Sequence, residues 1–123
     1  MRLNEQGLKD RAAWEEKGYE LPAFDRKKVT ENTKAAPRWI HFGAGNIFRA
    51  FQANAAQRLL NEGVIDTGLT VAEGYDYEII EKMNRPHDGY SILVTLKADG
   101  KLEKTVVGSI VESLILDSAD PQE

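Results

Sequence analysis

The chain of 123 residues contains no cysteine, which excludes disulfides, thiolate nucleophiles and cysteine-ligated zinc. Only His41 and His87 could supply an imidazole ligand, so we expect no metal site. The net charge is −4 and the lysines and arginines are dispersed, so no basic stripe is present to neutralise nucleic-acid phosphates. No stretch approaches the roughly 18 apolar residues of a membrane span, and the N-terminus lacks the apolar core of a secretory signal. We therefore expect a cytoplasmic protein that binds neither nucleic acid nor membranes.

The sequence divides at Pro37, because a proline prevents any helix from continuing into the segment that follows. Residues 1–37 carry charges of both signs, and we interpret them as a packed lead-in arm with one short helix that ends at Gly18. Residues 38–123 form the second predicted unit. Within it, "RWIHF" (38–42) and "GLTVAEG" (68–74) have the composition of short strands, each next to a glycine.

Helices are predicted between and after these strands. From Asn46 onward apolar residues recur at intervals of four until Gly63, which predicts one helix whose buried stripe contains Ile47, Phe51, Ala55 and Leu59. The segment "YDYEIIEKMN" (75–84) fits a short helix with inward-facing Ile79, Ile80 and Met83.

The last third alternates apolar and polar residues. Asp99-Gly100 predicts a hairpin turn, with residues 90–97 and 102–107 as its arms, because glycine tolerates the positive φ of such turns. Residues 118–123 are polar and are predicted to form a loop. The order strand, helix, strand, helix and then a β-hairpin predicts an α/β fold, the first half of a doubly wound nucleotide-binding sheet.

The stretch "IHFGAGNIFRA" (40–50) has two glycines between the first strand and its helix. Gly43 would allow a sharp turn, and Gly45, which lacks a Cβ, would allow the backbone to approach a pyrophosphate. The helix that begins near Asn46 would direct its free amide groups and positive dipole at that anion. The fingerprint of such sites has a third glycine where this chain has Phe48, so a purely structural turn remains the alternative.

A dinucleotide site also requires an acid at the end of the second strand, to accept hydrogen bonds from the ribose hydroxyls. Glu73 ends "LTVAE", 30 positions after Gly43, and the intervening "NEGVIDTG" (61–68) accounts for the length of the connection. A carboxylate there would repel the 2′-phosphate of NADP, so the sequence predicts that NAD is preferred. Asp76 is the nearby alternative for the ribose contact.

With these features in place, the sequence resembles the mannitol dehydrogenase family of polyol-specific long-chain dehydrogenases. The resemblance rests on "IHFGAGNIFRAFQ" (40–52) and "VVGSIVESLIL" (106–116), while "ELPAFD" (20–25) is similar to the lead-in of the family's fructuronate reductases. It implies a partial Rossmann-like domain at the N-terminus of a larger enzyme. Position by position, it places the following residues around the dinucleotide, with Glu73 at the adenosine ribose: Gly43, Ala44, Gly45, Asn46, Ile47, Phe48 and Arg49.

The family transfers hydride between NAD(H) and a sugar alcohol or sugar acid without zinc. Its catalytic lysine lies in a K-x-x-x-x-N-x-x-H pattern of a later domain, and that pattern is absent here. The resemblance therefore implies a cofactor-binding part that holds no catalytic residue and meets its substrate through another domain. D-mannonate and D-fructuronate are the favoured substrates, followed by mannitol and mannitol 1-phosphate. A dinucleotide-binding or interaction module that never catalyses is the alternative, with the hairpin as its partner surface.

Overall fold

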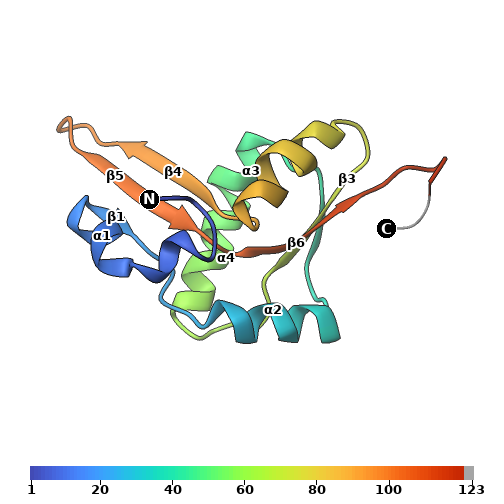
Figure 1. The fold of residues 1–123 in the computed structure, drawn as a ribbon, viewed down its shortest axis with the longest axis horizontal. Coiled ribbons are helices and arrows are strands. Elements are labelled where there is room, and N and C mark those ends of the chain that lie inside the picture. The colour runs from blue at the N-terminus through green and yellow to red at the C-terminus, as the bar shows by residue number, and fades with distance from the viewer. Residues whose placement is uncertain (121–123) are drawn as a thin grey trace.

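Residues 1–120 are described by a computed structural model, in which two three-stranded sheets are flanked by short helices (Figure 1). The first sheet is parallel and contains, in spatial order, β2 (Ile40–Phe42), β3 (Leu69–Glu73) and β6 (Ile110–Ile115). The second contains, in spatial order, β1 (Tyr19–Glu20), β5 (Leu102–Val107) and β4 (Ser91–Leu96). The predicted α/β class is confirmed, and both predicted strands of the second unit lie side by side in the parallel sheet.

The central strand β3 organises the main core. Leu69 and Val71 are fully buried, because a parallel strand between two neighbours is covered on both faces. The strand also pairs with β6, which the sequence indicated only as part of a β-rich region. This core consists of Ala44, Phe48, Ala53, Ala56, Leu69, Val71, Ile80, Val107 and Ile110.

The helix predicted from Asn46 to Gly63 is divided into α3 (Asn46–Ala50) and α4 (Gln52–Asn61). The predicted buried stripe is wrong: the side chains of Ile47 and Phe51 are 74% and 70% exposed. The break at Phe51, whose φ is −103° and ψ −73°, changes the phase of the helix. The buried face instead contains Phe48, Ala53, Ala56, Gln57 and Leu60.

The segment predicted as a helix over 75–84 contains η2 (Ile79–Asn84), a wide π-type turn, followed by the 3-10 turn η3 (Arg85–His87). Ile80 is fully buried and Ile79 is partly buried, as predicted, but Met83 is 48% exposed. A π-turn has more residues per turn than the 3.6 of an α-helix, so the inward position falls on Asn84 instead of Met83.

The lead-in contains more structure than the sequence predicted. Its predicted short helix is α1 (Arg11–Glu16), preceded by the 3-10 turn η1 (Gly7–Lys9), and α2 (Arg26–Ala35) follows as a second helix. Trp14 is buried, donates a hydrogen bond from Nε1 to the carbonyl oxygen of Gly7 at 3.0 Å, and meets the ring of Tyr19 edge-on. Because β1 pairs with β5, the lead-in shares a sheet with the hairpin.

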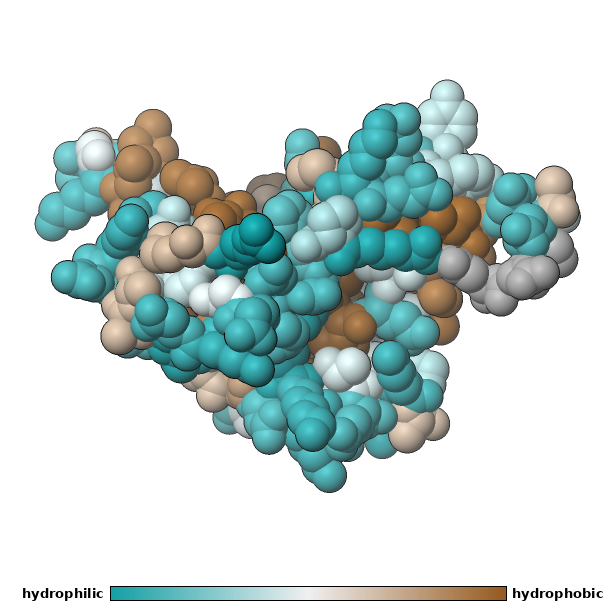
Figure 2. All heavy atoms as spheres, in the orientation of Figure 1, coloured by the Kyte–Doolittle hydropathy of each residue, from teal (hydrophilic) through white to brown (hydrophobic). Residues whose placement is uncertain are grey.

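The hairpin of β4 and β5 is confirmed. Gly100 has φ +83°, and a hydrogen bond of 2.8 Å from the N–H of Lys97 to the carbonyl of Lys101 closes the loop. Apolar side chains gather over this hairpin (Figure 2). Val94, Leu96 and Leu102 are 54%, 72% and 59% exposed, on the face opposite to the one that packs on α4.

The polar segment that ends the chain begins with a turn in which the N–H of Asp120 donates to the carbonyl of Asp117. Residues 121–123 of the predicted loop lie outside the described residues. None of the helices in residues 1–120 combines the length and the apolar character that a membrane crossing requires.

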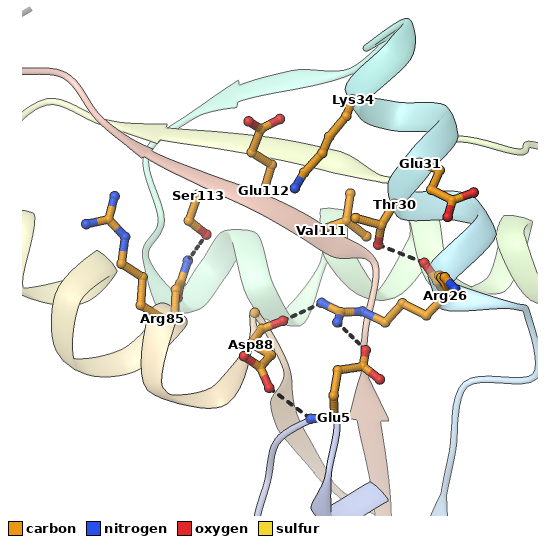
Figure 3. A pocket seen from close by; sticks show the side chains of 13 residues that line it. Glu5, Arg26, Thr30, Glu31, Lys34, Arg85, Asp88, Val111, Glu112 and Ser113 are labelled. Carbon is orange, nitrogen blue, oxygen red and sulfur yellow. Dashed lines mark hydrogen bonds and ion pairs between the residues drawn. The ribbon is translucent and has the colours of Figure 1, made fainter. Parts of the chain in front are cut away.

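Arg26, the first residue of α2, joins the lead-in to the rest of the molecule (Figure 3). Its guanidinium donates to the carboxylate of Glu5 at 2.7 Å and to the carbonyl of Asp88 at 2.5 Å. Two further bonds go to the carbonyl oxygens of Gly108, which follows β5, and Ile110, the first residue of β6. One side chain therefore holds three segments that are distant in the sequence.

The carboxyl group of Glu5 makes stability depend on pH. Burial alone would raise its pKa, but hydrogen bonds from Tyr90 and Arg26 and the charge of Arg26 outweigh burial and lower the pKa below 4.5. A lowered carboxyl pKa stabilises the fold fully above the unfolded-state pKa, and this contribution is lost as the pH falls through the folded-state value. We expect the melting temperature to fall on acidification below about pH 4.5.

The matched variant for this prediction is Glu5→Gln, which keeps the shape of the side chain and cannot titrate. Thermal melts from pH 3 to pH 7 should show a shallower acid decline for the variant than for the wild type. Parallel declines would contradict a role for Glu5 in the acid response.

Candidate functional site

The glycine turn lies at the carboxyl ends of β2 and β3. The N–H of Gly43 donates to the carbonyl of Ala72 at 2.8 Å, which attaches the turn to the neighbouring strand. Gly43 has φ +106°, a conformation that residues with a Cβ rarely adopt. The backbone conformation therefore requires glycine at position 43.

Gly45 is different. Its φ is −72°, which any residue adopts, and a Cβ added to it would meet no atom within 4 Å. Neither backbone strain nor packing within the described residues explains a glycine here. A close approach from outside the chain would explain it, as in a turn whose backbone contacts a pyrophosphate.

Glu73 lies beside this turn, as the sequence predicted for the acid at the end of the second strand. The N–H of Ala44 donates to its Oε1 at 3.0 Å, and the N–H groups of Tyr75 and Asp76 donate to Oε2 at 3.2 Å and 3.4 Å. The bond from Ala44 is the main cause of a lowered pKa of Glu73, and it outweighs the opposing effect of burial. Glu73 is therefore a carboxylate at neutral pH, 3.0 Å from the glycine turn.

Asp76, the alternative acid, is exposed beyond the end of β3. Its backbone N–H, not its carboxylate, is engaged with Glu73. It lies three residues farther along the chain, whereas Glu73 contacts Ala44 directly.

Phe48 and His41 support the turn from the side of the core. Phe48 is 4% exposed and stacks on the His41 ring, with 4.0 Å between centroids and 18° between planes. The Nδ1 of His41 lies 2.9 Å from the carbonyl oxygen of Gly43, which can only accept, so Nδ1 carries the proton. Although the sequence placed Phe48 around the dinucleotide, its side chain points into the core, and only its backbone can face a ligand.

Arg49 is half-buried, and its guanidinium is bonded within the molecule. Its Nε donates to the carbonyl of Ala44 at 3.2 Å, and Nη2 donates to Oδ1 of Asn84 at 2.8 Å. Burial lowers the pKa of the guanidinium, although arginine stays charged. Asn84 is 4% exposed and was not predicted, because the apolar pattern of residues 75–84 assigned the inward position to Met83.

Asn46 and Arg49 line a cavity of about 360 Å³ between α3, η2 and β4, whereas Ile47 is exposed on the outer face. A larger cavity of about 720 Å³ lies between α2, η3 and β6, and side chains of both charges surround it, including Lys34, Glu31 and Glu112 (Figure 3). None of the eight predicted residues lines the larger cavity. We therefore place the candidate site at the glycine turn.

Within residues 1–120, no three histidine, aspartate or glutamate side chains are grouped closely enough to hold a metal ion. The arrangement at the turn consists of a carboxylate, a helix start without a side-chain cap, and a glycine whose position is open to an approaching group. Such a set suits a ligand that combines hydroxyl groups with an anion.

Comparison with known proteins identifies relatives of the chain. No protein-family model matches it. A curated protein, D-mannonate oxidoreductase of Thermotoga maritima, is 51% identical over 121 residues, which cover 98% of this chain and 22% of the relative. The chain thus spans about a fifth of the length of the curated relative that it matches.

Two solved structures share the fold. Pseudomonas fluorescens mannitol 2-dehydrogenase, in a ternary complex with NAD and D-mannitol, has a TM-score of 0.71 at 24% identity and matches 94% of this chain and 22% of its own. D-sorbitol dehydrogenase in substrate-free form has a TM-score of 0.75 at 23% identity and matches 99% of this chain and 23% of its own. The resemblance to the mannitol dehydrogenase family, and the fold of the N-terminal part of its Rossmann domain, are confirmed.

Proposed function

We propose that this chain, as a counterpart of the N-terminal part of the mannitol dehydrogenase family, binds NAD(H) at the turn from Gly43 to Gly45. It would serve an oxidoreductase that transfers hydride between NAD(H) and a sugar acid or sugar alcohol. D-mannonate and D-fructuronate are the favoured substrates, because the relative at 51% identity is a D-mannonate oxidoreductase. We also propose a cytoplasmic location for the protein.

The observation that carries this proposal is the unexplained glycine at position 45. A Cβ there would neither strain the backbone nor contact any atom within 4 Å, so the glycine matters only when something else approaches. The backbone amides at the start of α3, from Asn46 to Phe48, lie next to it and have no side-chain cap. We propose that these amides receive the pyrophosphate.

The side chains divide the remaining tasks. Glu73 would accept hydrogen bonds from the adenosine ribose hydroxyls, because its carboxylate is held at the turn and Oε1 keeps a lone pair beside the bond from Ala44. The same negative charge would reject the 2′-phosphate of NADP. When bound, NAD supplies the hydride acceptor of the reaction. The substrate would be held by the domain that contains the lysine, asparagine and histidine of the family pattern.

Replacing Gly45 with valine tests the pyrophosphate contact. The variant should fold with an unchanged melting temperature, because the position has room and an ordinary φ. Its affinity for NADH, measured by fluorescence titration, should fall by at least about tenfold, because the new side chain occupies the approach to the backbone.

NADPH is the control ligand. Gly63→Ala, at the end of α4, is the control variant. We expect the wild type to bind NADH more tightly than NADPH, and Gly63→Ala to lose stability without losing affinity. If a folded wild type binds neither nucleotide, or if Gly45→Val binds NADH as tightly as the wild type, the proposed pyrophosphate site is wrong.

A further inference from the structure

Both backbone polar groups of Ala44 are held by side chains. The N–H donates to Glu73 at 3.0 Å, and the carbonyl accepts from Nε of Arg49 at 3.2 Å. Ala44 is 1% exposed and lies between Gly43 and Gly45, the two most flexible positions of the turn. Without these two bonds, the turn would lose the restraints that select one of its many conformations.

Arg49 is itself fixed by Asn84. Oδ1 of Asn84 accepts from Nη2 of Arg49 at 2.8 Å, and Nδ2 donates to Oγ of Ser113 at 2.9 Å. Because a guanidinium can only donate, the amide oxygen must face Arg49, which fixes the orientation of the amide group. The backbone carbonyl of Asn84 also accepts from the N–H of Gly89 at 2.8 Å. A chain of bonds thus runs from β6 through Asn84 and Arg49 to the glycine turn.

We propose that Asn84 is a positioning residue for the cofactor-binding turn. Through Arg49 it fixes the carbonyl of Ala44 while Glu73 fixes the N–H, so that the turn keeps its ligand-ready shape before any ligand arrives. The part that concerns affinity rests on the proposed function, namely that this turn binds the dinucleotide. Preorganisation raises affinity because the turn has already lost its conformational entropy before the ligand binds.

Two substitutions of Asn84 separate positioning from bulk packing. Asn84→Leu keeps a similar volume and removes both hydrogen bonds. Asn84→Asp keeps an oxygen for Arg49, and the hydroxyl of Ser113 can donate to its other oxygen. Ser113→Ala removes only the outer bond of the chain.

Two measurements apply to each variant of the 123-residue chain. Amide hydrogen exchange of the Ala44 N–H, followed by NMR without nucleotide, should become about tenfold faster in Asn84→Leu. The dissociation constant for NADH should rise about fivefold in the same variant. Asn84→Asp should restore both values to within about twofold of the wild type. Ser113→Ala should give values between those of the wild type and those of Asn84→Leu.

An unchanged Ala44 exchange rate in a folded Asn84→Leu variant overturns the proposal, and so does a failure of Asn84→Asp to restore it. If Asn84→Leu does not fold, Arg49→Met tests the same step, and wild-type exchange at Ala44 in that variant again overturns it. If the wild type does not bind NADH, the proposed function fails, while the exchange rates still decide whether Asn84 positions the turn.

Discussion

Replacing Glu73 with alanine should weaken NADH binding by about 1.5–3 kcal/mol, the usual contribution of a hydrogen bond to a charged group. This corresponds to a dissociation constant roughly 10- to 150-fold higher. Two effects act in the same direction: the ribose hydroxyls lose their acceptor, and the N–H of Ala44 loses the partner that it has at 3.0 Å. Fluorescence titration with NADH measures the sum of these effects.

Glu73→Gln separates charge from geometry. Glutamine keeps one oxygen that can accept from Ala44, but it carries no charge to repel the 2′-phosphate of NADP. We expect this variant to lose most of the preference for NADH over NADPH. It should bind NADH more tightly than Glu73→Ala does.

Asp76→Asn is the control, because Asp76 is exposed and only its backbone N–H contacts Glu73. It should keep the nucleotide preference of the wild type. If Asp76→Asn instead abolishes the preference while Glu73→Gln retains it, the ribose contact belongs to Asp76 and the role assigned to Glu73 is wrong.

The parts of the site that could be predicted from the sequence depend on local chemistry. Gly43 begins the turn and takes a positive φ, and "LTVAE" forms a strand whose last residue reaches the turn that follows the adjacent strand. Parallel strands joined by a helix bring their carboxyl ends to one edge of the sheet, so a strand–turn–helix–strand pattern is enough to bring Gly43 and Glu73 together.

The parts that could not be predicted depend on polar side chains whose partners are distant in the sequence. Gln57 lies on the buried face of α4, where its side chain bonds the carbonyl of Val106 and the N–H of Gly108, about 50 residues away. Periodicity counts only apolar residues, so it assigned the buried stripe to the face of Ile47 and Phe51. Asn84 was missed for the same reason, and no local motif marks either residue.

Arg26 is another residue whose role could not be predicted from the sequence. Its replacement with methionine should reduce the free energy of unfolding by about 3–5 kcal/mol. Its side chain is 10% exposed, donates to Glu5 and to three backbone carbonyls, and lies 3.9 Å above the ring of Tyr90. Methionine fills much of the same volume, but it leaves the three carbonyls without the guanidinium donors and the Glu5 carboxylate without its charged partner. Urea denaturation followed by circular dichroism measures the loss.

Lys82→Met is the matched control, because Lys82 pairs with Glu78 at 3.2 Å while both side chains are about 70% exposed. An exposed pair contributes little, so this variant should stay within about 0.5 kcal/mol of the wild type. Equal losses in the two variants would contradict the role assigned to Arg26.

Arg26 makes no contact with Gly43, Ala44 or Gly45, so the fraction of Arg26→Met that remains folded should bind NADH with wild-type affinity. Asn84→Leu should instead weaken NADH binding in the molecules that remain folded, because the bonds of Asn84 reach the turn through Arg49.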